Sequence, residues 1–299
     1  MFENVLVGVD GRPNGRDAIT LASRLVDPDG RLTLVHVHRG EATDARDASL
    51  ELLERELAAA GVQAELASVA ASRPGRGLHE QAEERNADLL VVGSHSRGVF
   101  GRAMLGDDTR GALDGAPCAV AVATRGHAEH PAPLANVGVA YNGSPESVAA
   151  LAVARELAAR TRATVHALEV VSIPPVAYTG IVAAALGQTI EAMMQEASAR
   201  MRKLPGVEGS AVYGLAGEEL AAFGEQLDLL VVGSRGYGPV RRLVLGSTSN
   251  FLQRHARCPL LVLPRVAAVD VDGDAQIDSG TIPIAPHGHS STQIAQPLQ

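Results

Sequence analysis

The sequence predicts an α/β protein built from two tandem, doubly wound domains, each with a five-stranded parallel sheet. The first observation is an internal repeat: the run DLLVVGS occurs at Asp88–Ser94 and again at Asp228–Ser234, an offset of 140 residues. The second is the alternation of β-branched apolar runs with segments of helical periodicity, which is typical of βαβ units and a parallel sheet. The third is the length of 299 residues, which suits two domains.

The elements of the first copy follow in order from this periodicity. Val5–Val9 is an apolar run and predicts the first strand, and a helix with apolar residues at 18, 21, 22 and 25 ends at the turn 27–30. The remaining elements expected are a strand at 32–37, a helix marked by Leu50, Leu53 and Leu57 and closed by Gly61, a strand at 62–70, a short helix at 78–85, a strand at 89–92, a helix near 109–113 and a strand at 119–123.

The second copy repeats this order with one insertion. NVLVGVDGRPNG at Asn4–Gly15 pairs with NVGVAYNGSPES at Asn136–Ser147 at an offset of 132, so eight residues are inserted further on. We expect domains at residues 1–126 and 134–266. The last 33 residues, 267–299, hold four Asp and no Lys or Arg, and predict a disordered acidic tail.

Composition and charge exclude several classes of function. The net charge of −8 argues against a broad electrostatic grip on nucleic acid or an anionic membrane, and aromatic residues at 3% argue against base stacking. Neither a signal peptide nor a run of about 18 apolar residues is visible. We therefore expect a cytoplasmic protein that uses neither nucleic acid nor membrane as a partner.

Chemistry is expected at the carboxyl ends of the first and fourth strands, where open parallel sheets bind ligands. In the second copy the fourth strand is followed by Gly233-Ser-Arg-Gly236, nine residues, and Gly246-Ser247. Such a loop can cradle phosphate, because glycines allow close backbone approach and a helix N-terminus attracts negative charge. The alternative, a strand–loop–helix turn without a ligand, is equally compatible with the spacing.

Together with the VGVDG-like start of each copy, the pattern G-x2-G-x9-G-[S/T] after DLLVVGS resembles the universal stress protein family over residues 3–265. The resemblance implies a Rossmann-like fold, a tendency to dimerise and, in one branch of the family, ATP binding. Carried over to the second copy, it implies that Gly233, Gly236, Gly246 and Ser247 hold phosphates and ribose. Val170 matches the position that meets adenine, and Asn142 stands where the family has Asp, which weakens any Mg²⁺ contact there.

The first copy departs from the pattern. Asp10, Val37, Gly93 and Gly106 hold the corresponding positions, but Ser96 replaces the second glycine and Asp107 the hydroxyl residue. Asp107 would repel a phosphate. We therefore expect the second copy to be the better ATP site and the first to be weak or empty.

The leading hypothesis is an ATP-binding regulatory or stress-adaptation module, with or without Mg²⁺. Hydrolysis is expected to be slow, because no general base or catalytic metal cluster is visible. A nucleotide-free interaction protein and an enzyme of the adenine-nucleotide hydrolase type are the alternatives. The apolar last strands suggest an intramolecular pseudo-dimer, to which a homodimer and an unidentified regulatory partner could be added.

Two smaller features have structural explanations. His36 and His38 alternate on one strand and share a face, but lack an evident Cys or carboxylate partner for a metal. Cys118 and Cys258 precede apolar strands, and we expect buried small residues rather than redox sensors.

Overall fold

The computed structural model describes residues 1–40, 42–94, 111–131, 133–172, 183–234, 243 and 245–265, with the backbone alone for 183–186. The tail expected at 267–299 lies outside these residues. Below, "first half" denotes the elements from Asn4 to Ala123, and "second half" those from Asn136 to Leu263.

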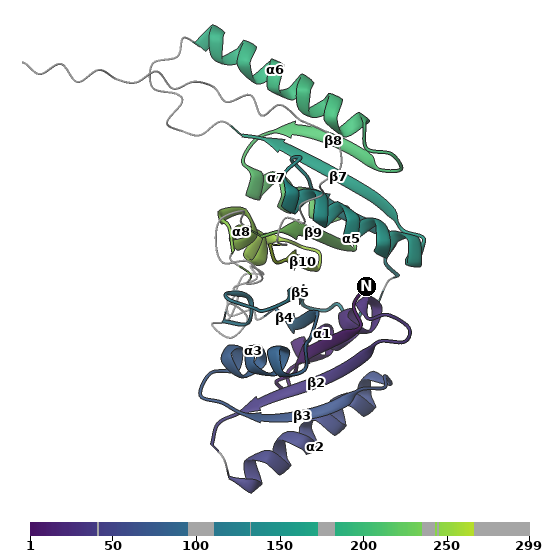
Figure 1. Ribbon diagram of the computed structural model, residues 1–299, viewed down its shortest axis with the longest axis vertical. Coiled ribbons are helices and arrows are strands. Elements are labelled where there is room, and N and C mark those ends of the chain that lie inside the picture. The colour runs from purple at the N-terminus through teal and green to yellow at the C-terminus, as the bar shows by residue number, and fades with distance from the viewer. Residues whose placement is uncertain are drawn as a thin grey trace, which may run out of the picture. The chain divides into compact units, whose positions relative to one another are not determined.

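Strands and helices alternate along both halves (Figure 1). The first half contains β1 (Asn4–Gly8), α1 (Pro13–Leu25), β2 (Arg31–His38), α2 (Thr43–Ala60), β3 (Glu65–Ala70), α3 (Pro74–Glu84), β4 (Leu89–Gly93) and β5 (Ala119–Ala123). The second contains β6 (Asn136–Ala140), α5 (Pro145–Thr161), β7 (Thr164–Val171), α6 (Ala183–Arg202), β8 (Glu208–Tyr213), α7 (Ala216–Phe223), η2 (Gly224–Gln226), β9 (Leu229–Gly233), α8 (Ser247–His255) and β10 (Leu260–Leu263).

Within the described residues, the strands form one sheet of ten in the order β3-β2-β1-β4-β5-β10-β9-β6-β7-β8. Pairing is parallel within each half, and β5 pairs with β10 in the antiparallel sense. The chain order reverses between β1 and β4, and again between β6 and β9. These two switch points are where an open α/β sheet forms a ligand crevice.

The core has two layers because alternate strand residues point to opposite faces of the sheet. Val5 and Val7 pack into the layer that contains α1, α2 and α5, whereas Leu6 packs into the layer with α3, α7 and α8. Both layers contain residues of both halves, so the core is continuous across β5 and β10. Cys118 and Cys258 are buried as predicted, and burial raises the pKa of both thiols to about 12.

Local signals explain most element boundaries. Gly61 ends α2 with a φ of +65°, the left-handed conformation that glycine adopts without strain. Helix α3 begins at Pro74 rather than at residue 78, because proline suits the first turn of a helix. Strand β3 begins at Glu65, three residues later than predicted. No helix in the described part of the chain is long and apolar enough to cross a membrane.

Candidate functional site

The switch point of the second half holds a cavity of about 280 Å³ at the carboxyl ends of β6, β7 and β9. Its described lining is Ala140, Tyr141, Asn142, Ser144, Glu146, Ser147, Leu168, Val170, Ala216, Leu220, Val232, Gly233, Ser234 and Gly246–Ser249. The set includes residues from the N-terminal ends of α5, α7 and α8, so three helix N-termini border one space. Their partial positive charges favour an anion there.

Asn142 shapes the loop after β6. Its Oδ1 accepts the N–H of Ser144 at 3.1 Å, and Gly143 completes the turn with a φ of +80°. Ser144 then caps α5 by accepting the N–H of Ser147 at 3.3 Å. Because the turn uses the side-chain oxygen of Asn142, the amide NH₂ is the group left to face a ligand, and it is a donor.

The first half builds the same turn from Asp10, whose Oδ1 accepts the N–H of Arg12 at 3.1 Å. Asp and Asn therefore stabilise the turn in the same way, since each side-chain oxygen accepts the backbone N–H two residues later. They differ in what they offer to a ligand, since the carboxylate only accepts hydrogen bonds and the amide also donates them.

Gly233, at the end of β9, is required by packing. A Cβ at this position would lie 2.7 Å from the Glu146 Cβ and 3.0 Å from its backbone carbonyl. The equivalent Gly93 is tighter still, because a Cβ there would lie 2.1 Å from the carbonyl oxygen of Asn14. Both glycines thus allow the start of a helix to approach the strand end, a reason that needs no ligand.

Helix α8 opens at Gly246 and Ser247, as predicted from the sequence. The cap is made by Ser249, whose Oγ accepts the N–H of Gly246 at 2.9 Å. Ser247 is the first helical residue and is exposed, so its hydroxyl is not used for capping. The geometry thus assigns the capping of α8 to Ser249 and leaves the Ser247 hydroxyl out of the cap.

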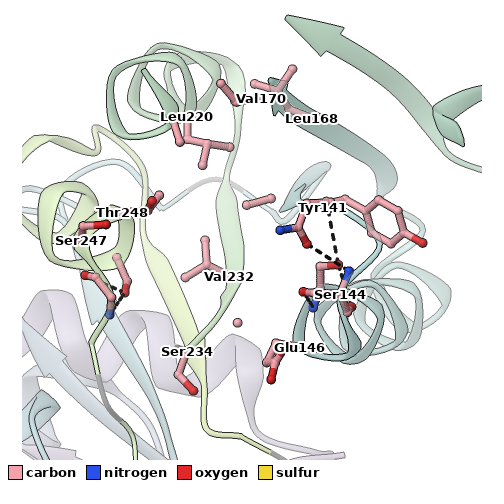
Figure 2. Close-up of a pocket in the computed structure, with 17 residues that line it drawn as sticks. Tyr141, Ser144, Glu146, Leu168, Val170, Leu220, Val232, Ser234, Ser247 and Thr248 are labelled. Atoms are coloured by element: carbon pink, nitrogen blue, oxygen red, sulfur yellow. Dashed lines mark hydrogen bonds between the residues drawn. The ribbon is translucent and has the colours of Figure 1, made fainter. Parts of the chain in front are cut away.

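The cavity is apolar at one end and polar at the other (Figure 2). Val170, Leu168 and Leu220 lie together at one end, and Ser234 and Glu146 lie at the opposite end. The Ser234 hydroxyl is buried without a hydrogen-bond partner, which is uncommon for a polar group. A ligand with a planar apolar group at one end and an anionic group at the other would match this cavity.

Glu146 is a functional candidate that sequence reasoning missed. It lies in the first turn of α5 and is the only charged side chain among the described lining residues. The helix start was readable from NGSPES, because proline is favoured in the first turn of a helix, which places Glu146 at the N-terminus of α5. The Glu146 carboxylate would repel an anionic ligand, so an anion that carries a bound cation is favoured here over an anion without one.

The predicted site residues fall into two groups. Asn142, Val170, Gly233, Gly246 and Ser247 line the cavity of the second half. Asp10, Val37 and Gly93 line the corresponding cavity of the first half, which measures about 80 Å³. Gly236 and Gly106 lie outside the described residues, as do Ser96 and Asp107.

His36 also lines the smaller cavity, and its Nδ1 lies 2.9 Å from the Oγ of Ser49 on α2. Burial lowers the pKa of His36, the nearby His38 lowers it further, and Asp10 opposes the shift. Among the described residues, no group of three or more His, Cys, Asp or Glu side chains is arranged to hold a metal ion.

The fold and crevice define a tandem pair of Rossmann-like α/β domains with a ligand cavity at a strand-order switch point. The family model of the universal stress protein family matches twice, at residues 1–124 and 134–264. The chain therefore belongs to the universal stress protein family.

Individual relatives agree with this assignment. A universal stress protein of Mycobacterium tuberculosis is 34% identical over 186 residues, covering 59% of this chain and 61% of the relative. A universal stress protein of Thermus aquaticus is 35% identical over 133 residues, covering 40% of this chain and 97% of the relative. The crystal structure of a universal stress protein from Archaeoglobus fulgidus shares the fold, with a TM-score of 0.60 at 20% identity over 88% of this chain and 98% of that one.

Proposed function

We propose that the chain binds ATP in the cavity of its second half and acts as a regulatory or stress-adaptation module. The observation that carries the proposal is the convergence of three helix N-termini on a cavity of about 280 Å³ with an apolar and a polar end. Adenine fits the apolar end beside Val170, and the phosphates fit the N-terminus of α8. We also propose that the first half is a weak or empty site, because Asp107 stands where the second half has Ser247.

We propose that Mg²⁺ enters this site with the nucleotide. The described lining offers one carboxylate, Glu146, and no metal cage. Mg²⁺ usually keeps several waters and binds through one or two carboxylates plus phosphate oxygens, which suits this donor set. Glu146 would hold the ion against the phosphates, and Asn142 would donate a hydrogen bond to the ligand.

The proposal also includes an intramolecular pseudo-dimer of the two halves. It is supported by the antiparallel register of Leu261 with Ala121 and by Arg160 of α5, which donates to the carbonyl oxygens of Arg24 and Leu25 at 2.9 Å. These carbonyls end α1, so an arginine of one half closes a helix of the other.

The test is mass spectrometry of small molecules released from the purified protein, followed by calorimetry with ATP. We expect adenine nucleotide from the wild type and none from Gly246→Asp, which places a carboxylate at the N-cap of α8. Gly187→Asp is the matched control, because Gly187 has no positive φ, no atom within 4 Å of a new Cβ and no place in the described cavity lining. A wild type that releases no nucleotide and gives no heat with ATP would favour the nucleotide-free interaction module.

A further inference from the structure

A backbone contact joins the first half to the segment that precedes α8. The N–H of Leu243 donates to the carbonyl oxygen of Ala116 at 2.9 Å, and the N–H of Gly115 donates to the carbonyl oxygen of Leu243 at 3.0 Å. Leu243 lies three residues before Gly246, the N-cap of α8 and part of the cavity lining. The contact between the halves is therefore close in sequence to the cavity lining.

Packing fixes the same contact. The side chain of Leu243 is fully buried in the core layer that also contains Ala112, Leu113 and Ala116 of the first half. Buried apolar contacts of this kind allow few alternative arrangements, because protein interiors are close-packed. Leu243 is therefore held from the first half by its backbone and its side chain together.

The receiving segment of the first half is itself anchored. His79 of α3 donates through Nε2 to the carbonyl oxygen of Ala112 at 2.8 Å, and the N–H of Ala116 donates to Leu113 at 3.3 Å. Gly115 has a φ of +84°, a conformation that strains any residue with a side chain. The N–H that Gly115 donates to Leu243 is thus positioned by a backbone conformation that favours glycine.

We infer that Gly115 and Ala116 of the first half are positioning residues for the nucleotide cavity of the second half. They hold Leu243 and thereby set the place of Gly246 and the N-terminus of α8. The first half then supports the ligand site of the second half. This role does not depend on whether the first half binds a ligand. The inference rests on the proposed function, and it adds that nucleotide binding and the contact between the halves are coupled.

The experiment compares Gly115→Val with Gly40→Val in the full-length chain. Gly40 is a matched control, because its φ of +85° imposes the same strain and no atom lies within 4 Å of a new Cβ. We expect Gly115→Val to bind ATP about five- to twentyfold more weakly than Gly40→Val by calorimetry, the usual size of a coupling between sites. Gly115→Ala and Gly40→Ala form a milder pair with the same ranking, should either valine variant fail to fold.

Amide hydrogen exchange supplies a readout that a general loss of stability would not move. By reciprocity, ATP should slow exchange at Gly115 in the wild type, and Gly115→Val should speed exchange at 245–249 without affecting α5. Equal ATP affinity in the Gly115 and Gly40 variants would overturn the inference. If the wild type binds no adenine nucleotide, the proposed function fails, and unchanged exchange at 245–249 in ligand-free Gly115→Val would then overturn the inference separately.

Discussion

Replacing Ser247 with aspartate would give the second half the Gly-Asp sequence that the first half has at Gly106-Asp107. Ser247 is the exposed first residue of α8 and lines the cavity, so the new carboxylate would lie beside the proposed phosphate position. Two unit charges 4 Å apart interact by about 4 kcal/mol at an effective dielectric of 20, and by about 1 kcal/mol in water. Exposure places the expected loss nearer the lower value, at about 1–2 kcal/mol, or roughly five- to thirtyfold in ATP affinity.

Calorimetry with ATP and with adenosine tests this reasoning. Adenosine lacks phosphate, so its affinity should be the same in Ser247→Asp and the wild type, whereas ATP affinity should fall and recover partly at high salt. Ser247→Asn is the neutral control of similar size. The melting temperature should not fall, because an acidic residue in the first turn interacts favourably with the helix dipole by about 0.3–1 kcal/mol. Equal ATP affinity in Ser247→Asp and Ser247→Asn would refute the placement of the phosphates at α8.

Four further predictions concern single residues. Glu146→Gln should strengthen the binding of metal-free ATP and reduce the gain from added Mg²⁺, and calorimetry with and without the ion would contradict the proposed Mg²⁺ contact if both affinities stayed at wild-type values. Gly93→Ala should lower the free energy of unfolding by about 3 kcal/mol or more, because its Cβ would lie 2.1 Å from a carbonyl oxygen. Gly187→Ala, with open space in helix α6, should raise it by up to about 1 kcal/mol in the same urea titrations. Because burial lowers the pKa of His36, the unfolded chain takes up this proton at higher pH, so stability should fall as pH drops below about 6.5. His36→Asn, which can still bond to Ser49, should flatten that slope between pH 7.5 and 5.5; an unchanged slope would exclude His36 as its source.

The spacing of apolar residues was sufficient to predict the order of strands and helices. Buried side chains recur at every second residue in a strand and at every third or fourth residue in a helix. The end of α2 at Gly61 was also predicted from a local signal, because helices commonly end at a glycine in the left-handed conformation. The start of α3 was misplaced because its signal is Pro74 and not an apolar residue. Local rules thus specify elements well and their ends less well.

The site was only partly predictable, because its geometry depends on contacts between distant segments. The spacing in the second half pointed to Gly233 as a ligand residue, but its contact with Glu146 on a different element gives it a packing role that no local pattern reveals. Likewise, the role of Ser249 in capping α8 was not predicted, because it depends on the fold of that turn, which brings the Ser249 Oγ within 2.9 Å of the Gly246 nitrogen. The bond from Leu243 to Ala116 joins segments more than a hundred residues apart and has no sequence signature at all.

The antiparallel pairing of β5 with β10 has a consequence for how the two copies can differ. In an assembly of identical chains, every substitution appears in both subunits at once, so a site cannot be lost from one without being lost from the other. Here the partner strand belongs to the same chain and stays at high effective concentration at any dilution. One copy can therefore carry Asp107 while the other keeps Ser247. The two copies can thus have different binding properties, which the identical subunits of a homodimer cannot.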